Sequence, residues 1–217
     1  MRAPHNRGTE GIALKLYLAS SNPGKLREFT ELAAESSVDG FEIAALPEIA
    51  KFPAYEETAT TFAENAAGKA LHYSQFTDEA VLADDSGLVV PALGGAPGVY
   101  SARYAGPSAT DADRVAKLLG EMKDMTGDAR RAQFVCVMAV SRRGRALSVV
   151  SDLARGLLTD APVGTGGFGY DPIFLFPPLG RTYAEASKAE KNRLSHRGKA
   201  FRKTMYVLSS TKAVTFL

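Results

Sequence analysis

The stretch that most constrains the fold runs from Val81 to Gly106, VLADDSGLVVPALGGAPGVYSARYAG. Its first apolar residues indicate the end of a buried strand, which then breaks into Asp84, Asp85, Ser86 and Gly87. Adjacent side chains on an extended chain point to opposite faces, so the two carboxylates are expected to face different surroundings. Carboxylates released from a hydrophobic strand by a glycine turn are common sites for hard cations and general bases. The same residue types also dominate ordinary turns, so both interpretations stay open on this stretch alone.

The composition is that of an ordinary soluble globular protein. The 217 residues are 45% hydrophobic and 23% charged, and the formal net charge of +2 disfavours a nonspecific nucleic-acid binder. The apolar runs are too short for a transmembrane helix, so no membrane partner is expected. The single cysteine, Cys136, lies in an apolar run and is expected to be buried, as in a reducing compartment. The predicted location is therefore the cytoplasm.

The chain is expected to form one domain after a short extension. Residues 1–13 are polar and lack the apolar segment of a signal peptide, so we expect a frayed N-terminal extension. Residues 14–217 show no internal repeat and are long enough for a single domain with two lobes. The three histidines are far apart and pair with no cysteine spacing, which disfavours a zinc site.

A strand followed by a capped helix is predicted near the N-terminus. Leucines alternate over Leu14 to Ser20, which is typical of a strand. In the following loop, Asn22 can cap a helix and Pro23 suits its first position. Free backbone N–H groups, the helix dipole and the Lys25 ammonium would together make an anion site. The spacing is not that of a Walker A loop, and an ordinary strand-to-helix turn is the alternative.

The next elements bring polar side chains toward a common cleft. Phe41 to Leu46 indicates a second strand. A helix is predicted from about Thr61 to Phe76, with Thr61 and Glu64 in the spacing of a capping box. Asn65 and Lys69 are four residues apart, so they share one face of that helix. Glu57 lies just before the helix and is free to act as a ligand.

The middle of the chain indicates a helix and a long hairpin. Thr110 is expected to cap a helix, and Gly127 to Arg131 is interpreted as a polar linker. Ala132 to Val140 and Ala146 to Ser151 then form two strands joined by a tight turn. Leu153 to Leu158 can prolong the second strand across a glycine.

A glycine-rich tract, GTGGFGYD, spans residues 164–171. Its glycines allow a backbone to approach a ligand closely, while Phe168 and Tyr170 offer faces for stacking. The tract does not follow a strand in the pattern of a dinucleotide fold. The alternative is a loosely held surface loop.

The C-terminal segment, Ser187 to Leu208, is basic. Ser195 can cap a helix, which places His196 and Arg197 in its first turn. Cations at a helix N-terminus oppose the dipole, so we expect a ligand to supply the missing negative charge or acceptor. A solvated basic face is the alternative. The buried stripe of this helix is expected to comprise Phe201, Met205 and Leu208.

Six tracts, taken together and in order, closely resemble those of the inosine-triphosphate pyrophosphatase family, in its bacterial branch. The resemblance runs from about Leu14 to the C-terminus. The tracts are SSNPGK at 20–25, EET…TFAENA at 56–66, ADDSGL at 83–88, LGGAPGVYSARYAG at 93–106, GTGGFGYDPIF at 164–174 and EKNRLSHRGKA at 190–200.

The resemblance implies an α/β fold with a long twisted mixed sheet flanked by helices, two lobes with the active-site cleft between them, and a homodimer. It also implies an enzyme that hydrolyses aberrant purine nucleoside triphosphates such as dITP, ITP and XTP. Cleavage between the α- and β-phosphates would give the monophosphate and pyrophosphate, with Mg²⁺ as cofactor. Neither nucleic acid nor a membrane is implied as a partner.

The resemblance also implies roles for individual residues. Asp85 would accept a proton and bind magnesium, Glu57 would be the other metal ligand, and Ser86 would contact substrate. The triphosphate would be held by Ser20, Ser21, Asn22, Pro23, Gly24 and Lys25. The nucleoside and its base would be bound by Phe168, Gly169, Tyr170, Asp171, Lys191, His196 and Arg197. Many family members have Thr where this chain has Ser20, and both residues provide a hydroxyl group.

These parts allow a metal-assisted hydrolysis. The reference pKa of an aspartate is about 3.9, so Asp85 is expected to be ionised and to be a weak base, with positioning and the metal supplying most of the rate. A 6-oxo purine would accept hydrogen bonds from His196, Arg197 or backbone N–H groups, whereas the amino group of adenine would leave those donors unpaired.

Two other functions are consistent with parts of the sequence. One is a Maf-like nucleotide pyrophosphatase that acts on pyrimidine or modified nucleotides, which the GTGGFGYD and SHRG tracts disfavour. The other is a nucleic-acid binder that uses the basic C-terminal segment, which the near-balanced charge disfavours.

Overall fold

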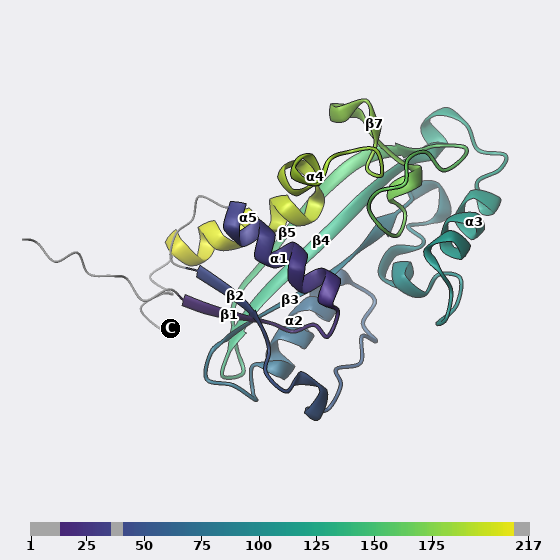
Figure 1. The fold of residues 1–217 in the computed structure, drawn as a ribbon. Coiled ribbons are helices and arrows are strands. Elements are labelled where there is room, and N and C mark those ends of the chain that lie inside the picture. The colour runs from purple at the N-terminus through teal and green to yellow at the C-terminus, as the bar shows by residue number, and fades with distance from the viewer. Residues whose placement is uncertain (1–13, 36–40, 211–217) are drawn as a thin grey trace, which may run out of the picture.

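A mixed sheet of seven strands, in the order β2-β1-β3-β4-β5-β6-β7, runs through the computed structural model, which describes residues 14–35 and 41–210 (Figure 1). The predicted extension, residues 1–13, lies outside the described residues, so the division of the chain between residues 13 and 14 stays a prediction. The strands are β1 Leu14–Leu18, β2 Phe41–Ala45, β3 Ala80–Val89, β4 Arg131–Arg142, β5 Arg145–Leu158, β6 Phe174–Phe176 and β7 Arg181–Thr182. The pairs β2–β1 and β1–β3 are parallel, and the remaining pairs are antiparallel.

Five α-helices accompany the sheet within the described residues. They are α1 Pro23–Glu35, α2 Phe62–Tyr73, α3 Asp111–Glu121, α4 Lys188–Leu194 and α5 His196–Ser210. The expected caps are confirmed, because Thr61 and Thr110 accept from backbone N–H groups in the first turns of α2 and α3. Ser195 likewise accepts from Gly198 N at 3.1 Å at the start of α5. None of these helices combines the length and apolarity that crossing a bilayer requires.

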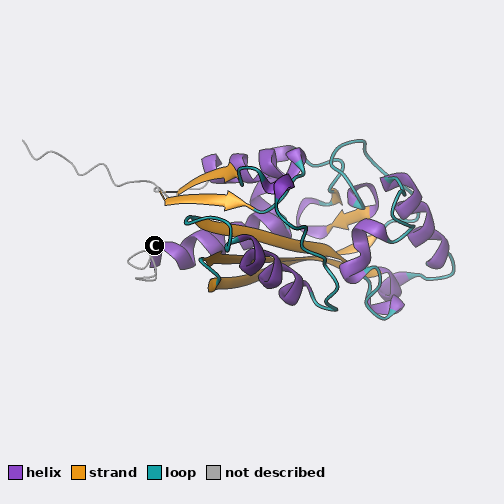
Figure 2. Ribbon diagram, turned by 90° about the horizontal axis from the view of Figure 1, so that it is seen from below, coloured by secondary structure: helices purple, strands orange, loops and turns teal. Residues whose placement is uncertain are grey.

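Helices cover both faces of the sheet (Figure 2). Helices α1 and α5 lie side by side across one face (Figure 1), where the rings of Phe29 and Phe201 make an edge contact at 5.8 Å. Helix α2 covers the opposite face through Ala66 and Ala70. The buried stripe predicted for α5 is confirmed, since Phe201, Met205 and Leu208 are all in the core.

Helix α1 also holds the C-terminal segment through a row of acidic residues. The carboxylate of Glu28 pairs with Arg197 at 2.9 Å, and that of Glu31 pairs with Lys188 at 2.5 Å. One turn further on, Glu35 accepts from the Nδ2 group of Asn192 at 3.1 Å. These three acidic residues recur at helical spacing, so they lie on one face of α1, and that face contacts α4 and α5.

Strand β3 is longer than the sequence predicted. The turn expected at Asp84 to Gly87 is wrong, because β4 pairs with every β3 residue from Val81 to Val89. The backbone ladder with β4 outweighs the local preference of Asp, Ser and Gly for a turn. The two carboxylates therefore lie in mid-strand, where their side chains must alternate between faces.

The other edge of β3 has two different partners. β1 pairs with β3 only at Ala80 to Leu82. Further along, Leu88 N donates to Ser101 Oγ at 2.9 Å, and Val90 N donates to Ala96 O at 3.1 Å. Ser101 belongs to a 3₁₀ turn, Gly98–Arg103, which thus takes the place of a strand. The Asp84–Ser86 segment lies between these two partners.

The interpretation of Gly127 to Arg131 as a polar linker is wrong. Gly127–Arg130 forms a 3₁₀ turn, and the Arg130 side chain is buried. Its guanidinium donates to four backbone carbonyls, those of Met122, Met125, Leu158 and Thr159. Those carbonyls lie at the ends of α3 and β5 and need donors, which explains why an arginine is buried here. The predicted extension of the second hairpin strand through Leu158 is confirmed.

The close packing of the 3₁₀ turn on Gly87 leads to a stability prediction. A Cβ atom at Gly87 would lie 2.5 Å from Gly98 O and closer still to Ser101 Oγ. Gly87→Ala should therefore lower the free energy of unfolding by about 2–3 kcal/mol, measured by urea denaturation. Gly120→Ala is the control, because a Cβ there meets nothing within 4 Å, and it should be neutral or stabilising by up to about 1 kcal/mol. Equal effects of the two substitutions would contradict this packing.

Candidate active site

Asp84 and Asp85 face opposite sides of the sheet, as their alternation predicted. Asp84 points toward α1 and α5, where Lys25 Nζ donates to its Oδ1 at 2.8 Å. Arg197 Nε lies 3.6 Å from the other Asp84 oxygen. Asp85 points toward α2, where it accepts from Asn65 Nδ2 at 3.0 Å. The two neighbouring acids therefore have different chemical surroundings.

The surroundings of Asp84 keep it ionised. Burial alone would raise its pKa, but the nearby charges of Lys25, Arg197 and Lys69 lower the pKa of this carboxyl well below its usual range. Because it is almost fully buried and joins β3 to cations on α1 and α5, Asp84 acts as a structural anchor.

The surroundings of Asp85 make it a better base than its residue type predicts. Burial raises the pKa of Asp85 to about 6, the hydrogen bond from Asn65 opposes this shift, and the charge of Glu57 adds to it. Asp85 is thus still ionised at neutral pH, and its affinity for a proton is well above that of a solvated aspartate. A carboxylate of this kind suits a general base.

Lys69 and Glu57 complete the cluster on the α2 side. The Lys69 ammonium pairs with the Glu57 carboxylate and donates to Asp84 O at 3.1 Å. Burial would lower the pKa of Lys69, but Asp84, Glu57 and Asp85 together raise it, so the lysine stays charged. The expectation that Asn65 and Lys69 share one face of α2 is confirmed, because both contact the Asp84–Asp85 pair on β3. No specific role was predicted for either residue.

Asn65 also fixes the loop that carries Glu57. Its Oδ1 accepts from Ala59 N at 3.1 Å, and its Nδ2 donates to Ala59 O at 3.3 Å as well as to Asp85. One buried amide therefore links the loop before α2 to the carboxylate on β3. Such a link sets the relative positions of Glu57 and Asp85.

The predicted anion loop lies at the start of α1. Asn22 Oδ1 accepts from Gly24 N at 2.8 Å and from Lys25 N at 3.3 Å, so the expected cap is confirmed. A cavity of about 360 Å³ joins this loop to the α2 cluster. Its lining includes Ser20 and Ser21 on one side and Glu57 and Lys69 on the other. The cavity thus brings the loop before α1 and an acidic residue to one space.

Phe168 is the exposed aromatic ring of the glycine-rich tract. It is 53% exposed, and its ring centroid lies 4.2 Å from Lys191 Nζ and 5.6 Å from the Arg197 guanidinium carbon. Lys191 also pairs with Asp171, whose Oδ2 accepts from Phe168 N at 2.8 Å. An open aromatic face bordered by cations suits a planar, electron-rich base.

Tyr170 does not offer the stacking face expected of it. Its ring is buried in the hydrophobic cluster that also contains Phe174, and its hydroxyl donates to Ser101 O at 3.0 Å. The preceding residue is also held in place, since Gly169 N donates to Asp111 Oδ2 at 2.7 Å. The tract is therefore held on both sides rather than loosely exposed.

His196 and Arg197 are buried in the first turn of α5. His196 stacks on Phe134 with ring centroids 4.7 Å apart, and its Nδ1 has no hydrogen-bond partner among the described residues. Burial, followed by the charges of Arg197 and Lys191, lowers the pKa of His196 well below its usual value, so the ring is neutral.

The expectation that a ligand supplies the negative charge for Arg197 is wrong. The guanidinium pairs with Glu28 at 2.9 Å and with Asp84, and it donates to Ser86 Oγ at 2.9 Å. Glu28 was missed by the sequence analysis, although it lies three residues after Lys25 and so shares its helical face.

Glu57 and Asp85 fit the chemistry of a magnesium site. Among the described residues, no three His, Cys, Asp or Glu side chains form a metal cluster. Magnesium commonly binds one or two carboxylates, keeps several waters and takes further oxygens from substrate phosphates, so two carboxylates are enough. The mutual repulsion of these carboxylates contributes to the raised pKa of Asp85, and a cation between them would relieve it.

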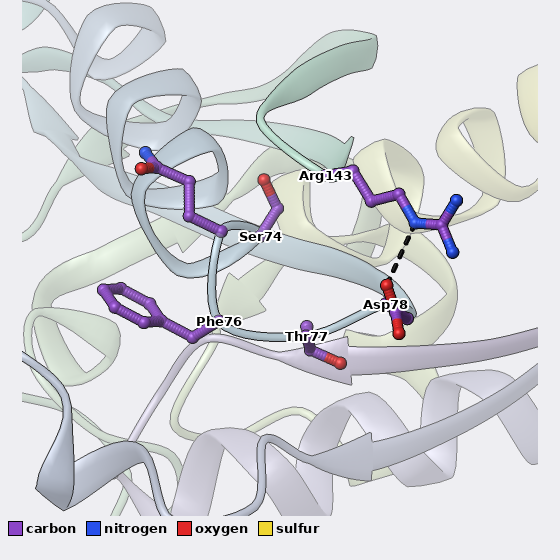
Figure 3. Close-up of a pocket in the computed structure, with 6 residues that line it drawn as sticks. Ser74, Phe76, Thr77, Asp78 and Arg143 are labelled. Carbon is purple, nitrogen blue, oxygen red and sulfur yellow. Dashed lines mark hydrogen bonds and ion pairs between the residues drawn. The ribbon is translucent and has the colours of Figure 1, made fainter.

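A larger cavity of about 460 Å³ lies away from these residues (Figure 3). It is bordered by Ser74 to Asp78 and by Arg143, whose Nε lies 3.1 Å from the Asp78 carboxylate. None of the predicted site residues lines it. The convergence of charged side chains, rather than cavity size, therefore locates the candidate site.

Comparison with known proteins identifies close relatives. A model of the Ham1 family matches residues 16–207. The dITP/XTP pyrophosphatase of Geobacillus kaustophilus is 47% identical over 189 residues, which cover 87% of this chain and 91% of that protein. The dITP/XTP pyrophosphatase of Pectobacterium atrosepticum is 49% identical over 190 residues, covering 87% and 94%. The solved structure of a HAM1 protein from Coxiella burnetii superposes with a TM-score of 0.80 at 42% identity, covering 91% of this chain and all of that one.

The raised pKa of Asp85 leads to a prediction for stability in the metal-free protein. The folded-state value of about 6 lies above the ordinary value, so folding takes up a proton at mildly acidic pH. The stabilisation is fully present below the unfolded pKa of about 3.9 and is lost as the pH rises through about 6. Asp85→Asn removes this titration and can still accept from Asn65. At pH 8 the variant should be about 1–3 kcal/mol more stable than the wild type.

The measurement is urea denaturation with a chelator at pH 4.5 and pH 8. The stability difference between variant and wild type should be small at the lower pH and large at the higher pH. A difference that does not change with pH would show that Asp85 has an ordinary pKa.

Proposed function

The chain belongs to the Ham1 family, and on that premise we propose that it hydrolyses aberrant purine nucleoside triphosphates, of the dITP and XTP type, to the monophosphate and pyrophosphate. The observation that carries the proposal is the buried Asp85, with Asn65, Lys69 and Glu57 around it, beside the cavity that reaches the loop before α1. The two relatives described above are named dITP/XTP pyrophosphatases, which supports the same activity.

The triphosphate would bind where α1 begins. The backbone N–H groups of the helix N-terminus and the hydroxyls of Ser20 and Ser21 are donors to phosphate oxygens. Lys25 and Lys69 add two positive charges on either side of β3. These groups suit a polyanion that lies along the part of β3 between the end of β1 and the 3₁₀ turn.

Glu57 and Asp85 would hold a magnesium ion together with phosphate oxygens and water. When bound, the ion would offset negative charge on the phosphates and favour ionisation of a nearby water. Glu57 would exchange its pairing with Lys69 for the metal, and Lys69 would keep its hydrogen bond to Asp84 O. Lys69 would then be free to meet a phosphate oxygen as well.

Asp85 would take the proton from the attacking water. The water oxygen bonds to the α-phosphorus while the bond from that phosphorus to the α–β bridging oxygen breaks, which releases pyrophosphate. A base with a pKa of about 6 is ionised at neutral pH and close enough to it to be effective. Asp84, with its lowered pKa, stays ionised and holds Lys25 in place. No covalent intermediate is needed.

The base would stack on Phe168 near Lys191 and Arg197. A 6-oxo group accepts hydrogen bonds from such donors and from backbone N–H groups, whereas the 6-amino group of adenine is itself a donor. His196 would lie beneath this site as a neutral ring, with Nδ1 able to donate or accept. The proposal also includes a cytoplasmic homodimer in which residues 14–217 form one two-lobed domain.

The activity is tested by pyrophosphate release with a panel of nucleotides and Mg²⁺. We expect kcat/KM for dITP and XTP to exceed that for dATP by about 100-fold or more, because adenine leaves buried donors unpaired. The panel includes dGTP, dTTP and UTP. Equal rates on all of them would contradict base selectivity, and a preference for pyrimidines would support a Maf-like enzyme instead.

Removal of the proposed base tests the mechanism. Asp85→Asn should lower kcat for dITP by at least about 100-fold, because the amide cannot accept the proton. Nucleotide binding, measured by calorimetry in the presence of Ca²⁺ in place of Mg²⁺, should change much less. If the variant keeps wild-type turnover, Asp85 is not the proton acceptor.

A further inference from the structure

The 3₁₀ turn Gly98–Arg103 contacts three separate parts of the candidate site. It belongs to the tract at residues 93–106, one of those that carry the family resemblance. The first contact is with β3, where Ser101 Oγ accepts from Leu88 N and donates to Gly98 O at 2.7 Å. Ser101 is buried, and Gly87 leaves the space in which its hydroxyl lies. This contact fixes β3 just beyond Asp85 and Ser86.

The second contact is with the glycine-rich tract. The carbonyl of Ser101 accepts the buried hydroxyl of Tyr170 at 3.0 Å. Phe168, the exposed ring proposed to stack on the base, lies two residues before Tyr170. A single residue of the turn therefore holds both the strand with the proposed general base and the tract with the proposed base platform.

The third contact is with the loop that carries Glu57. Arg103 Nη2 donates to Glu57 O at 3.2 Å, and the Arg103 guanidinium carbon lies 5.1 Å from the centre of the exposed Tyr100 ring. Stacking on Tyr100 limits the freedom of a long side chain, so its N–H groups are directed at the carbonyl. Arg103 and Glu57 are 46 residues apart in the chain.

Glu57 is consequently held by two contacts, one through its side chain and one through its backbone. Its carboxylate pairs with Lys69, and its backbone carbonyl accepts from Arg103. To bind a cation, the Glu57 carboxylate must give up its ion pair with Lys69. The backbone contact does not compete with that exchange, so it can keep the loop in place in both states.

We propose that Ser101 and Arg103 are positioning residues, through which the Gly98–Arg103 turn sets the spacing of the general base, the metal ligand and the base platform. The proposal rests on the function proposed above. Arg103 acts on Glu57 through a backbone hydrogen bond, so its donor group matters more than its charge. In the competing interpretation, the Arg103 charge contacts a substrate phosphate directly.

Three substitutions of Arg103 separate donor from charge. Arg103→Gln keeps an N–H donor without a charge, Arg103→Lys keeps a charge but loses the planar group that stacks on Tyr100, and Arg103→Met loses both. Arg131→Met is the matched control, because the Arg131 side chain is 67% exposed and, among the residues that the structure describes, its one ion pair is with Asp128 in the preceding turn. The full-length chain is used throughout, and thermal unfolding checks that each variant is folded.

Two readouts are measured on each variant. The first is the Mg²⁺ concentration that gives half-maximal turnover of dITP, together with kcat and KM. The second is the rate of backbone hydrogen exchange in the peptide that covers residues 55–60, in the metal-free protein. We expect Arg103→Met to raise the half-maximal Mg²⁺ concentration by about tenfold, the effect typical of losing a group that orients a metal ligand, and to speed exchange in that peptide. Arg103→Gln should stay within about threefold of the wild type in both.

The outcomes decide between the interpretations. Positioning through the hydrogen bond is supported if Arg103→Met changes both the half-maximal Mg²⁺ concentration and the exchange rate, while Arg103→Gln remains close to the wild type in both. The proposal is overturned if Arg103→Met matches the Arg131→Met control in both readouts. It is also overturned if Arg103→Gln is as impaired as Arg103→Met while Arg103→Lys is normal, because that pattern identifies a charge contact. If the wild type releases pyrophosphate from no nucleotide, the proposed function fails, and the exchange rates alone still test the contact between Arg103 and Glu57.

Discussion

The continuous pairing of β3 with β4 is the constraint on which the candidate site depends. Because the ladder runs without a break from Val81 to Val89, the side chains of Asp84 and Asp85 must lie on opposite faces of the sheet. A slip of one residue would exchange their surroundings and direct Asp85 at Lys25 and Arg197. The backbone register thus decides which side chains surround each carboxylate. Helices α1 and α5 supply the cations around Asp84, and α2 supplies Asn65 and Lys69 near Asp85.

The same division separates the acid–base properties of the two carboxylates. Asp84 meets cations from α1 and α5 and stays ionised, whereas Asp85 meets an amide and a neighbouring carboxylate and has a raised pKa. Pairs of acids whose surroundings shift their pKa values apart are typical of active sites in which one acid reacts and the other supports. Here the two acids are adjacent residues of one continuous strand. Their pKa values shift in opposite directions because α2 packs on one face of the sheet and α1 and α5 pack on the other.

Local signals in the sequence predicted most of the framework. The caps at Thr61, Thr110 and Ser195, the long hairpin and the shared face of Asn65 and Lys69 all depend on spacings of a few residues, and all are found. The errors arose where distant partners decide the outcome. β3 continues through a turn-like sequence because β4 pairs with it, and Arg197 finds its counter-charge on Glu28, 169 residues away. No pattern within the C-terminal segment could have identified that partner.

The contact between α1 and the C-terminal segment also has a consequence for how the enzyme is made. Glu28, Glu31 and Glu35 belong to an early part of the chain, and their partners Arg197, Lys188 and Asn192 are synthesised 157 to 169 residues later. During translation, the first strands and α1 leave the ribosome long before the residues that complete the site. A nascent chain therefore exposes the sheet face that α5 will cover, and the candidate site is incomplete until α5 has been synthesised and has docked.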